Sequence, residues 1–262
     1  MRILLSPAFA LLALAFAAPA YAQTGTWNAA DQYYDPAEMQ AAKRQLQHGS
    51  GDTRHLFLMA DRFEYHRDDD GSDLLVWDAE GWYGGDINRF WFKTEGTYDY
   101  ADESFEYAEL QYLYSRAISR YFDLQAGFRH DPAPESKGYA AFALHGLAPQ
   151  WFELDASVFF GEDGLTLGYF EAEYDLFLTQ RLVLQPRMEL NLRSQSDPEA
   201  LQGSGFTTGE LGLRLRYDIV REVAPYIGVS WERKFGETAD FAESAGEDVS
   251  STAFVAGLRL WY

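Results

Sequence analysis

The chain has 262 residues, enough for one large domain or two small ones, and it carries a formal net charge of −20. That charge argues against nucleic acid or an anionic lipid surface as a partner, because both would repel the chain. The absence of cysteine excludes disulfides and thiolate metal sites. Aromatic residues make up 16%, and 22 glycines stand against 9 prolines, which favours strands joined by glycine turns over a helical bundle.

The first 22 residues have the pattern of a secretory signal peptide. Arg2 supplies the positive start, residues 3–18 are apolar, and Ala20-Tyr21-Ala22 is a cleavage site of small-x-small type. A retained membrane helix is the alternative, but it would lack a basic stop-transfer flank. The sequence therefore predicts export and removal of residues 1–22. Beyond them, no run approaches the roughly 18 apolar residues that a spanning helix needs.

Residues 23–53 are polar and contain a short helical pattern over residues 36–44. We expect a short periplasmic extension here. From about residue 54 the pattern changes to alternating apolar and polar positions, which is typical of half-exposed strands. In residues 181–193 the even positions are apolar, from Leu182 to Leu192, whereas odd positions carry charges such as Arg187 and Glu189.

The same alternation recurs along the rest of the chain. It is clear in residues 75–83, 90–100, 122–129, 152–160, 170–176, 211–217 and 223–232, and less regular near 54–66, 104–116 and 138–147. The last strand ends at Tyr262 with apolar residues at every second position, as bacterial outer-membrane barrel proteins do. Together these stretches predict about twelve strands over residues 54–262.

The connections between the expected strands alternate in length. Long ones are expected over residues 67–73, 131–138, 194–205 and 236–248, and tight turns near 84–86, 117–120, 147–150, 179–180 and 218–222. Two connections on the long side, near residues 101–102 and 161–164, are also short. Outer-membrane barrels have short periplasmic turns and longer outer loops. We therefore predict an all-β, transmembrane, antiparallel up-and-down barrel in the outer membrane.

The polar stripe carries charges in nearly every strand, and these are too costly to bury unpaired in a dry sandwich core. The alternative is a soluble periplasmic sheet protein with these charges facing water. In a barrel they line the lumen, either as an ion-pair network that fills it or as a path or site for cations, and the sequence leaves both open. The candidate lumen residues are Asp78, Glu80, Glu95, Glu109, Glu171, Glu173, Arg187, Glu189 and Arg214.

Metal ligands of softer character are sparse. Met39, His48, His55 and Met59 lie in the extension and the first strand. Thioether and imidazole suit Cu(I), and imidazole with carboxylate suits Cu(II); ordinary packing and solvated side chains are the alternative. His130 and His145 have no serine partner at a strand-matched position, and no nucleotide-binding loop is present, so we expect no enzyme.

Several strand-borne segments resemble the outer-membrane copper resistance protein B family. They are residues 61–65, 77–86, 113–116, 127–129, 178–187 and 224–229, in the family's order, within a match over about residues 40–262. The resemblance implies a periplasm-facing, copper-binding barrel that works with a periplasmic multicopper oxidase in copper tolerance.

This chain departs from the family in its extension. Family members often carry a long arm rich in Met and His, whereas this extension has only Met39 and His48. Copper ligation would then fall to a few residues or to the carboxylates of the barrel. The alternative function is a general small-solute channel with a charged lumen.

Overall fold

The computed structural model describes residues 29–46, 49, 53–69 and 71–262, so the predicted signal peptide lies outside the described residues. The chain divides into two units, Met1–Asp52 and Thr53–Tyr262. The first contains a 3-10 turn, η1 (Ala29–Gln32), and helix α2 (Pro36–Leu46). Helix α2 begins where Asp35 Oδ1 accepts hydrogen bonds from the backbone N–H groups of Ala37 (2.8 Å) and Glu38 (3.3 Å). Among the described residues, no helix is long and apolar enough to cross a membrane.

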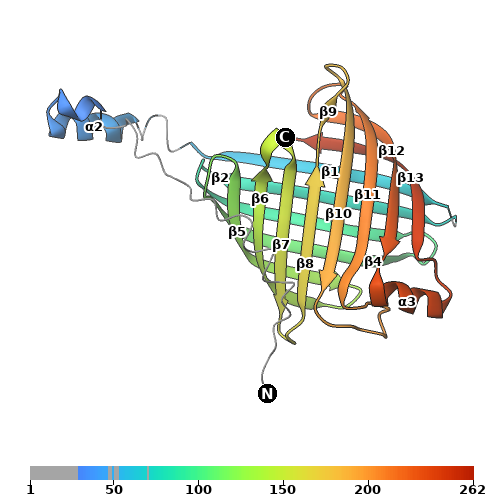
Figure 1. Cartoon of the computed structure of the whole chain (residues 1–262). Coiled ribbons are helices and arrows are strands. Elements are labelled where there is room, and N and C mark those ends of the chain that lie inside the picture. Colours follow the sequence, from blue (N-terminus) through green and yellow to red (C-terminus); the bar gives the residue numbers. More distant parts are fainter. Residues whose placement is uncertain (1–28, 47–48, 50–52, 70) are drawn as a thin grey trace. The chain divides into compact units, whose positions relative to one another are not determined.

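The second unit is one antiparallel sheet, shown in Figure 1. Its strands are β1 (His55–Asp68), β2 (Asp73–Gly84), β3 (Asn88–Asp99), β4 (Ser104–Ala117), β5 (Phe122–Ala133), β6 (Lys137–Leu147), β7 (Glu153–Gly161), β8 (Thr166–Glu173), β9 (Leu176–Phe177), β10 (Leu182–Arg193), β11 (Gly205–Tyr217), β12 (Val223–Lys234) and β13 (Ser250–Trp261). A 3-10 turn, η3 (Pro149–Trp151), precedes β7, and helix α3 (Gly236–Ala245) lies between β12 and β13.

The sheet closes on itself, because the first and last strands pair. Met59 lies opposite Trp261 in the β1–β13 ladder, and the backbones of Leu58 and Tyr262 exchange hydrogen bonds of 2.8 and 2.9 Å. The short β9 and the longer β8 both pair with the same edge of β10, whose other edge pairs with β11. They therefore form one interrupted strand. With β8 and β9 counted as one strand, the thirteen strands of the second unit form a closed twelve-strand barrel, which confirms the predicted fold class.

Successive residues along each strand point alternately to the outside and to the inside of the barrel. On β1, Phe63 and Tyr65 are about half exposed, whereas Arg62 and Glu64 between them are 2% and 0% exposed. Large apolar side chains are exposed on the outside of nearly every strand, among them Leu58, Phe90, Tyr112, Phe128, Phe142, Phe160, Leu213, Ile227 and Phe254. A closed barrel leaves no unpaired backbone edge, and this outer surface suits acyl chains. The barrel is therefore built to stand in a lipid bilayer.

Three sequence expectations about strand ends were wrong. The long connection expected over residues 67–73 is short, because β1 runs to Asp68 and β2 begins at Asp73, with Arg67 opposite Asp73. The long connection expected over residues 131–138 is short, because β5 runs on to Ala133 and β6 already begins at Lys137, with Asp131 opposite Lys137. The strand expected over residues 170–176 is interrupted between Glu173 and Leu176. The connections over residues 194–204 and around α3 are long, as expected.

Candidate functional site

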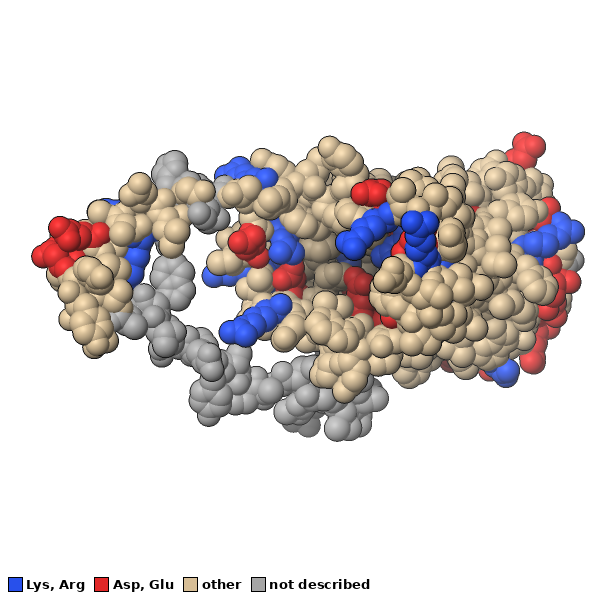
Figure 2. Space-filling view, turned by 90° about the horizontal axis from the view of Figure 1, so that it is seen from above, with Lys and Arg blue, Asp and Glu red and all other residues tan. Residues whose placement is uncertain are grey.

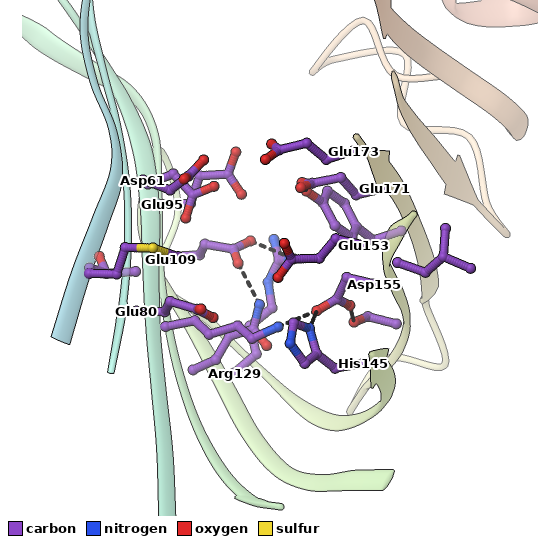
Figure 3. Close-up of a pocket in the computed structure, with 18 of the residues that line it drawn as sticks. Asp61, Glu80, Glu95, Glu109, Arg129, His145, Glu153, Asp155, Glu171 and Glu173 are labelled. Atoms are coloured by element: carbon purple, nitrogen blue, oxygen red, sulfur yellow. Dashed lines mark hydrogen bonds and ion pairs between the residues drawn. The ribbon is translucent and has the colours of Figure 1, made fainter. Parts of the chain in front are cut away.

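The barrel interior holds a small cavity of about 80 Å³. Figure 3 shows how acidic side chains from opposite walls point toward one another across it. Three full cations, Lys93, Arg129 and Arg259, also line it. Its carboxylates are Asp61, Asp78, Glu80, Glu95, Glu109, Glu153, Asp155, Glu171 and Glu173. The wall therefore carries nine carboxylates against three permanent cations.

The cavity extends toward the end of the barrel where the short turns and the C-terminus lie. Glu153, the first residue of β7, lies opposite Glu173, the last residue of β8. His145, near the end of β6, lies opposite Asp155. In Figure 2, red and blue side chains lie close together around a hollow in the surface, and others lie along the right edge of the view. In an outer-membrane barrel the short turns face the periplasm.

Part of the negative charge is neutralised by ion pairs inside the cavity. Arg129 Nη1 lies 2.6 Å from Glu109 Oε2, and Arg259 Nε lies 2.7 Å from Asp61 Oδ1. Asp155 pairs with Lys93 and lies 3.5 Å from His145 Nδ1. Each of the three cations that line the cavity therefore forms an ion pair with a carboxylate of the wall.

Three cavity carboxylates take part in none of the ion pairs recorded among the described residues: Glu80, Glu153 and Glu173. Glu80 accepts a hydrogen bond from Trp91 Nε1 (3.0 Å), and Glu173 accepts one from Gln185. Unbalanced carboxylates between low-dielectric walls focus a negative potential and raise the local concentration of cations. The cavity is therefore a candidate site for cations.

A layer of buried arginines adjoins the cavity. Arg187 Nη2 lies 2.6 Å from Glu171 and 2.8 Å from Glu189, and Arg214 Nε lies 2.5 Å from Glu64. The side chains of these arginines are at most 2% exposed. Burial of such charges is sustained only where each one is paired, so this layer is a tightly coupled network.

The structure places all nine predicted lumen residues on the inner face. Asp78, Glu80, Glu95, Glu109, Glu171 and Glu173 line the cavity, whereas Arg187, Glu189 and Arg214 belong to the buried network beside it. An ion-pair network and an acidic cavity thus occur together in one lumen.

The four softer metal-ligand candidates are not brought together as a set. Met59 lines the cavity, where its Sδ lies 3.5 Å from Arg259 Nη2. His55 is exposed at the start of β1, four positions away, which is about 13 Å along a strand. Met39 lies on α2 of the other unit, and His48 lies outside the described residues. Within the described ranges, no three His, Asp or Glu side chains converge in an arrangement that could hold a metal ion.

Sequence reasoning missed several interior charges. Arg62, Glu64 and His66 alternate with Phe63 and Tyr65, so the period of two was present on β1. Glu153, Asp155, Lys93 and Arg129 were recognised as polar positions but were not selected for the lumen. Ser157 also lines the cavity, where its hydroxyl donates a hydrogen bond to Asp155 (2.7 Å).

Comparison with known proteins agrees with this architecture. The family model of copper resistance protein B precursor (CopB) matches residues 54–262. A copper resistance protein B homolog from Pseudomonas syringae pv. tomato is 44% identical over 79% of this chain and 69% of its own length. Copper resistance protein B from Escherichia coli is 41% identical over 86% of this chain and 76% of its own length.

Among solved structures, the NanC porin has a TM-score of 0.51, with 11% identity over 79% of this chain and 99% of that one, a likeness of fold alone. The lipid-facing barrel and these relatives lead to one conclusion. The chain belongs to the copper resistance protein B family, as an outer-membrane β-barrel with a role in copper resistance.

Proposed function

We propose that the barrel binds copper ions in its acidic cavity and thereby helps to export or sequester copper at the outer membrane. The observation that carries the proposal is the charge of the cavity wall. Its nine carboxylates outnumber the three permanent cations that line it and the two buried arginines, Arg62 and Arg187, that pair with it. Three of these carboxylates, Glu80, Glu153 and Glu173, have no cationic partner among the recorded ion pairs, so they offer oxygen ligands to an incoming ion.

The chemistry of the wall also suits copper in particular. Met59 adds a thioether and His145 an imidazole to the carboxylate oxygens. Cu(II) accepts imidazole and carboxylate ligands, and thioether suits Cu(I). Because the described residues contain no converged cage of three ligands, binding is expected to be exchangeable, which a protein that passes ions onward requires.

The proposal has three further parts. The exposed apolar belt makes outer-membrane lipid the surrounding partner. A periplasmic multicopper oxidase is the protein partner that the family resemblance implies, facing the end where the short turns lie. In this proposal the chain supplies binding rather than catalysis.

Titration of the full-length refolded protein with Cu²⁺ tests the proposal. We expect saturable binding that the double variant E153Q/E173Q weakens at least about tenfold, because it removes two ligand charges at the mouth. The matched control is E135Q/E162Q, which removes two charges from exposed connections outside the cavity. Absence of copper binding, or equal binding by all three proteins, would refute the proposal.

A variant lacking residues 23–53 separates the extension from the lumen as the place of binding. If the cavity holds the ion, this shortened protein binds copper as the full chain does. Loss of binding would assign it to the extension that carries Met39 and His48. Planar-bilayer conductance that copper leaves unchanged, together with no binding, would favour the general solute channel.

A further inference from the structure

Three carboxylates stand side by side on neighbouring strands of the cavity wall. Asp78 on β2 lies directly opposite Glu95 on β3, and Glu95 lies directly opposite Glu109 on β4. All three line the cavity. Like charges in direct cross-strand positions repel, so a row of three carboxylates requires cations to stabilise it.

An arginine stands at each end of the row. Arg129 pairs with Glu109 at 2.6 Å. At the other end, Arg62 on β1 lies opposite Asp78 on β2. Its Nη2 lies 2.6 Å from Glu95 Oε1 and 3.5 Å from Asp78 Oδ2. One nitrogen of Arg62 is thus shared by two carboxylates. A bound metal ion would make the same kind of contact.

The position of Arg62 depends on an irregularity in β1. The pairing of β1 with β2 shifts register between Ala60 and Arg62. As a result, the consecutive residues Asp61 and Arg62 both turn inward: Asp61 lines the cavity, and the Arg62 side chain is 3% exposed. Bulges of this kind re-aim side chains next to functional sites. The extra residue brings an arginine to the one place where Asp78 and Glu95 meet.

A second observation is that some buried polar atoms of this wall have no hydrogen-bond partner. Gln111 lines the cavity beside Glu109, to which its Nε2 donates a hydrogen bond of 2.6 Å. Gln111 is only 6% exposed, and its Oε1 is buried without a hydrogen-bond donor. An amide oxygen without a donor is a ligand for a cation. Arg62 Nε likewise has no acceptor, so the guanidinium is held only at one end.

We propose that Arg62 is a tethered cation that occupies a latent divalent-cation site formed by Asp78 and Glu95, and that it sets how tightly the cavity holds metal. The inference rests on the proposed function and adds its affinity-determining residue. An incoming ion must compete with the guanidinium for both carboxylates. This competition lowers the affinity of the cavity for the metal ion. It also makes release of the ion easier, because Arg62 pairs with the two carboxylates again when the ion leaves.

The test is a gain of binding, measured only in variants that a heat-dependent shift in gel mobility shows to be folded, because an unfolded chain also exposes ligands for copper. In Cu²⁺ titrations of the full-length refolded barrel, R62Q should bind at least about tenfold more tightly than the unchanged protein. R62K, which keeps a cation on the same strand position, should bind much as the unchanged protein does. The triple variant R62Q/D78N/E95Q should lose the gain, since the two carboxylates that form the site are then neutral.

R216Q is the matched control. Arg216 is also buried and also contacts two carboxylates, Asp175 at 2.7 Å and Asp218 at 3.2 Å, but none of the three lines the cavity. R216Q should therefore leave copper affinity unchanged. A heat-dependent shift in gel mobility reports folding of each variant, and R62M replaces R62Q if the latter does not fold.

The possible outcomes separate the two proposals. If the unchanged protein binds copper and folded R62Q binds no more tightly, the Arg62 inference fails and the proposed function stands. If only R62Q binds, the latent site is supported and copper binding by the unchanged protein is refuted. If neither protein binds, both proposals fail. A gain of equal size in R216Q would also overturn the assignment to Arg62.

Discussion

Glu64 is a fully buried charge in the barrel, with 0% exposure. Its carboxylate accepts hydrogen bonds from Arg214 Nε (2.5 Å) and Nη2 (3.0 Å), and it lies 2.7 Å from His66 Nε2. Two charges buried together gain little over an apolar pair, but removal of one partner leaves the other uncompensated. The stability of this region therefore depends on both members being present.

We expect Glu64→Gln to lower the free energy of unfolding by about 3 kcal/mol, because it leaves Arg214 buried with only the more distant Glu210, at 3.6 Å, as a counter-charge. Urea unfolding of the barrel in lipid vesicles, followed by tryptophan fluorescence, measures the change. Glu135→Gln is the control: Glu135 is 74% exposed and pairs with Lys137, so the loss should stay below about 1 kcal/mol. Equal losses would contradict the importance of burial.

The alternation of residues could predict which face of a strand a charge occupies, but not which charge it meets. Glu64 and Arg214 are separated by 150 residues, and Lys93 and Asp155 by 62. Such pairs depend on how the strands are staggered around the barrel, which a period of two leaves undefined. The period of two was enough to predict the acidic face. It was not enough to predict the ion pairs or the three carboxylates without a cationic partner.

At the scale of elements, helix α3 is fastened to the connection over residues 194–204. Glu237 accepts hydrogen bonds from Ser196, from the Ser204 backbone N–H (3.1 Å) and from the Ser204 hydroxyl (3.0 Å). Thr238 Oγ1 accepts another from the Gly203 N–H (2.9 Å). The donors at Ser196 and Ser204 lower the pKa of Glu237, which lies on helix α3, outside the membrane-spanning strands.

Because the folded-state pKa of Glu237 is lowered, its carboxylate stabilises this attachment above its ordinary pKa, and the stabilisation is lost as pH falls through the lowered value. We expect the Ser204 amide to be protected from hydrogen exchange at neutral pH, after correction for intrinsic rates, and to lose protection in that acidic range. Glu237→Gln should reduce protection already at neutral pH. Glu243→Gln, on the same helix, should not; equal protection in both variants would rule out the role of Glu237.

Element ends were the least predictable part of the fold. Residues 131–138 are polar and contain two prolines, which is typical of a loop, yet the ladder continues until Asp131 meets Lys137. Arg129 also pairs with Asp131 at 2.7 Å, so these polar side chains belong to the inner face of a strand. The inward turn of both Asp61 and Arg62 is equally hidden, because a single extra residue changes no composition and only shifts the phase of the alternation.

For the whole molecule, the net charge of −20 and the acidic cavity act in the same direction on an approaching cation. Attraction over such distances is screened when the Debye length falls from about 30 Å at 0.01 M salt to about 4–5 Å at 0.5 M. We therefore expect the association rate of Cu²⁺ to fall severalfold between these concentrations of a non-complexing salt. Stopped-flow fluorescence of Trp91, which contacts His145, can measure the rate; a rate independent of salt would show that charge does not guide the ion.

The pairing of β1 with β13 has a consequence for the order in which the molecule is built. Arg259 and Met59, which meet at this junction, are separated by 200 residues, and the neighbouring strands elsewhere are joined by far shorter stretches of chain. Closing so long a loop costs the most chain entropy, so hairpins should form early and the ring should be completed last. Until then the growing sheet has two open borders, and a partner that shields them during insertion would shorten the time in which two copies could join edge to edge.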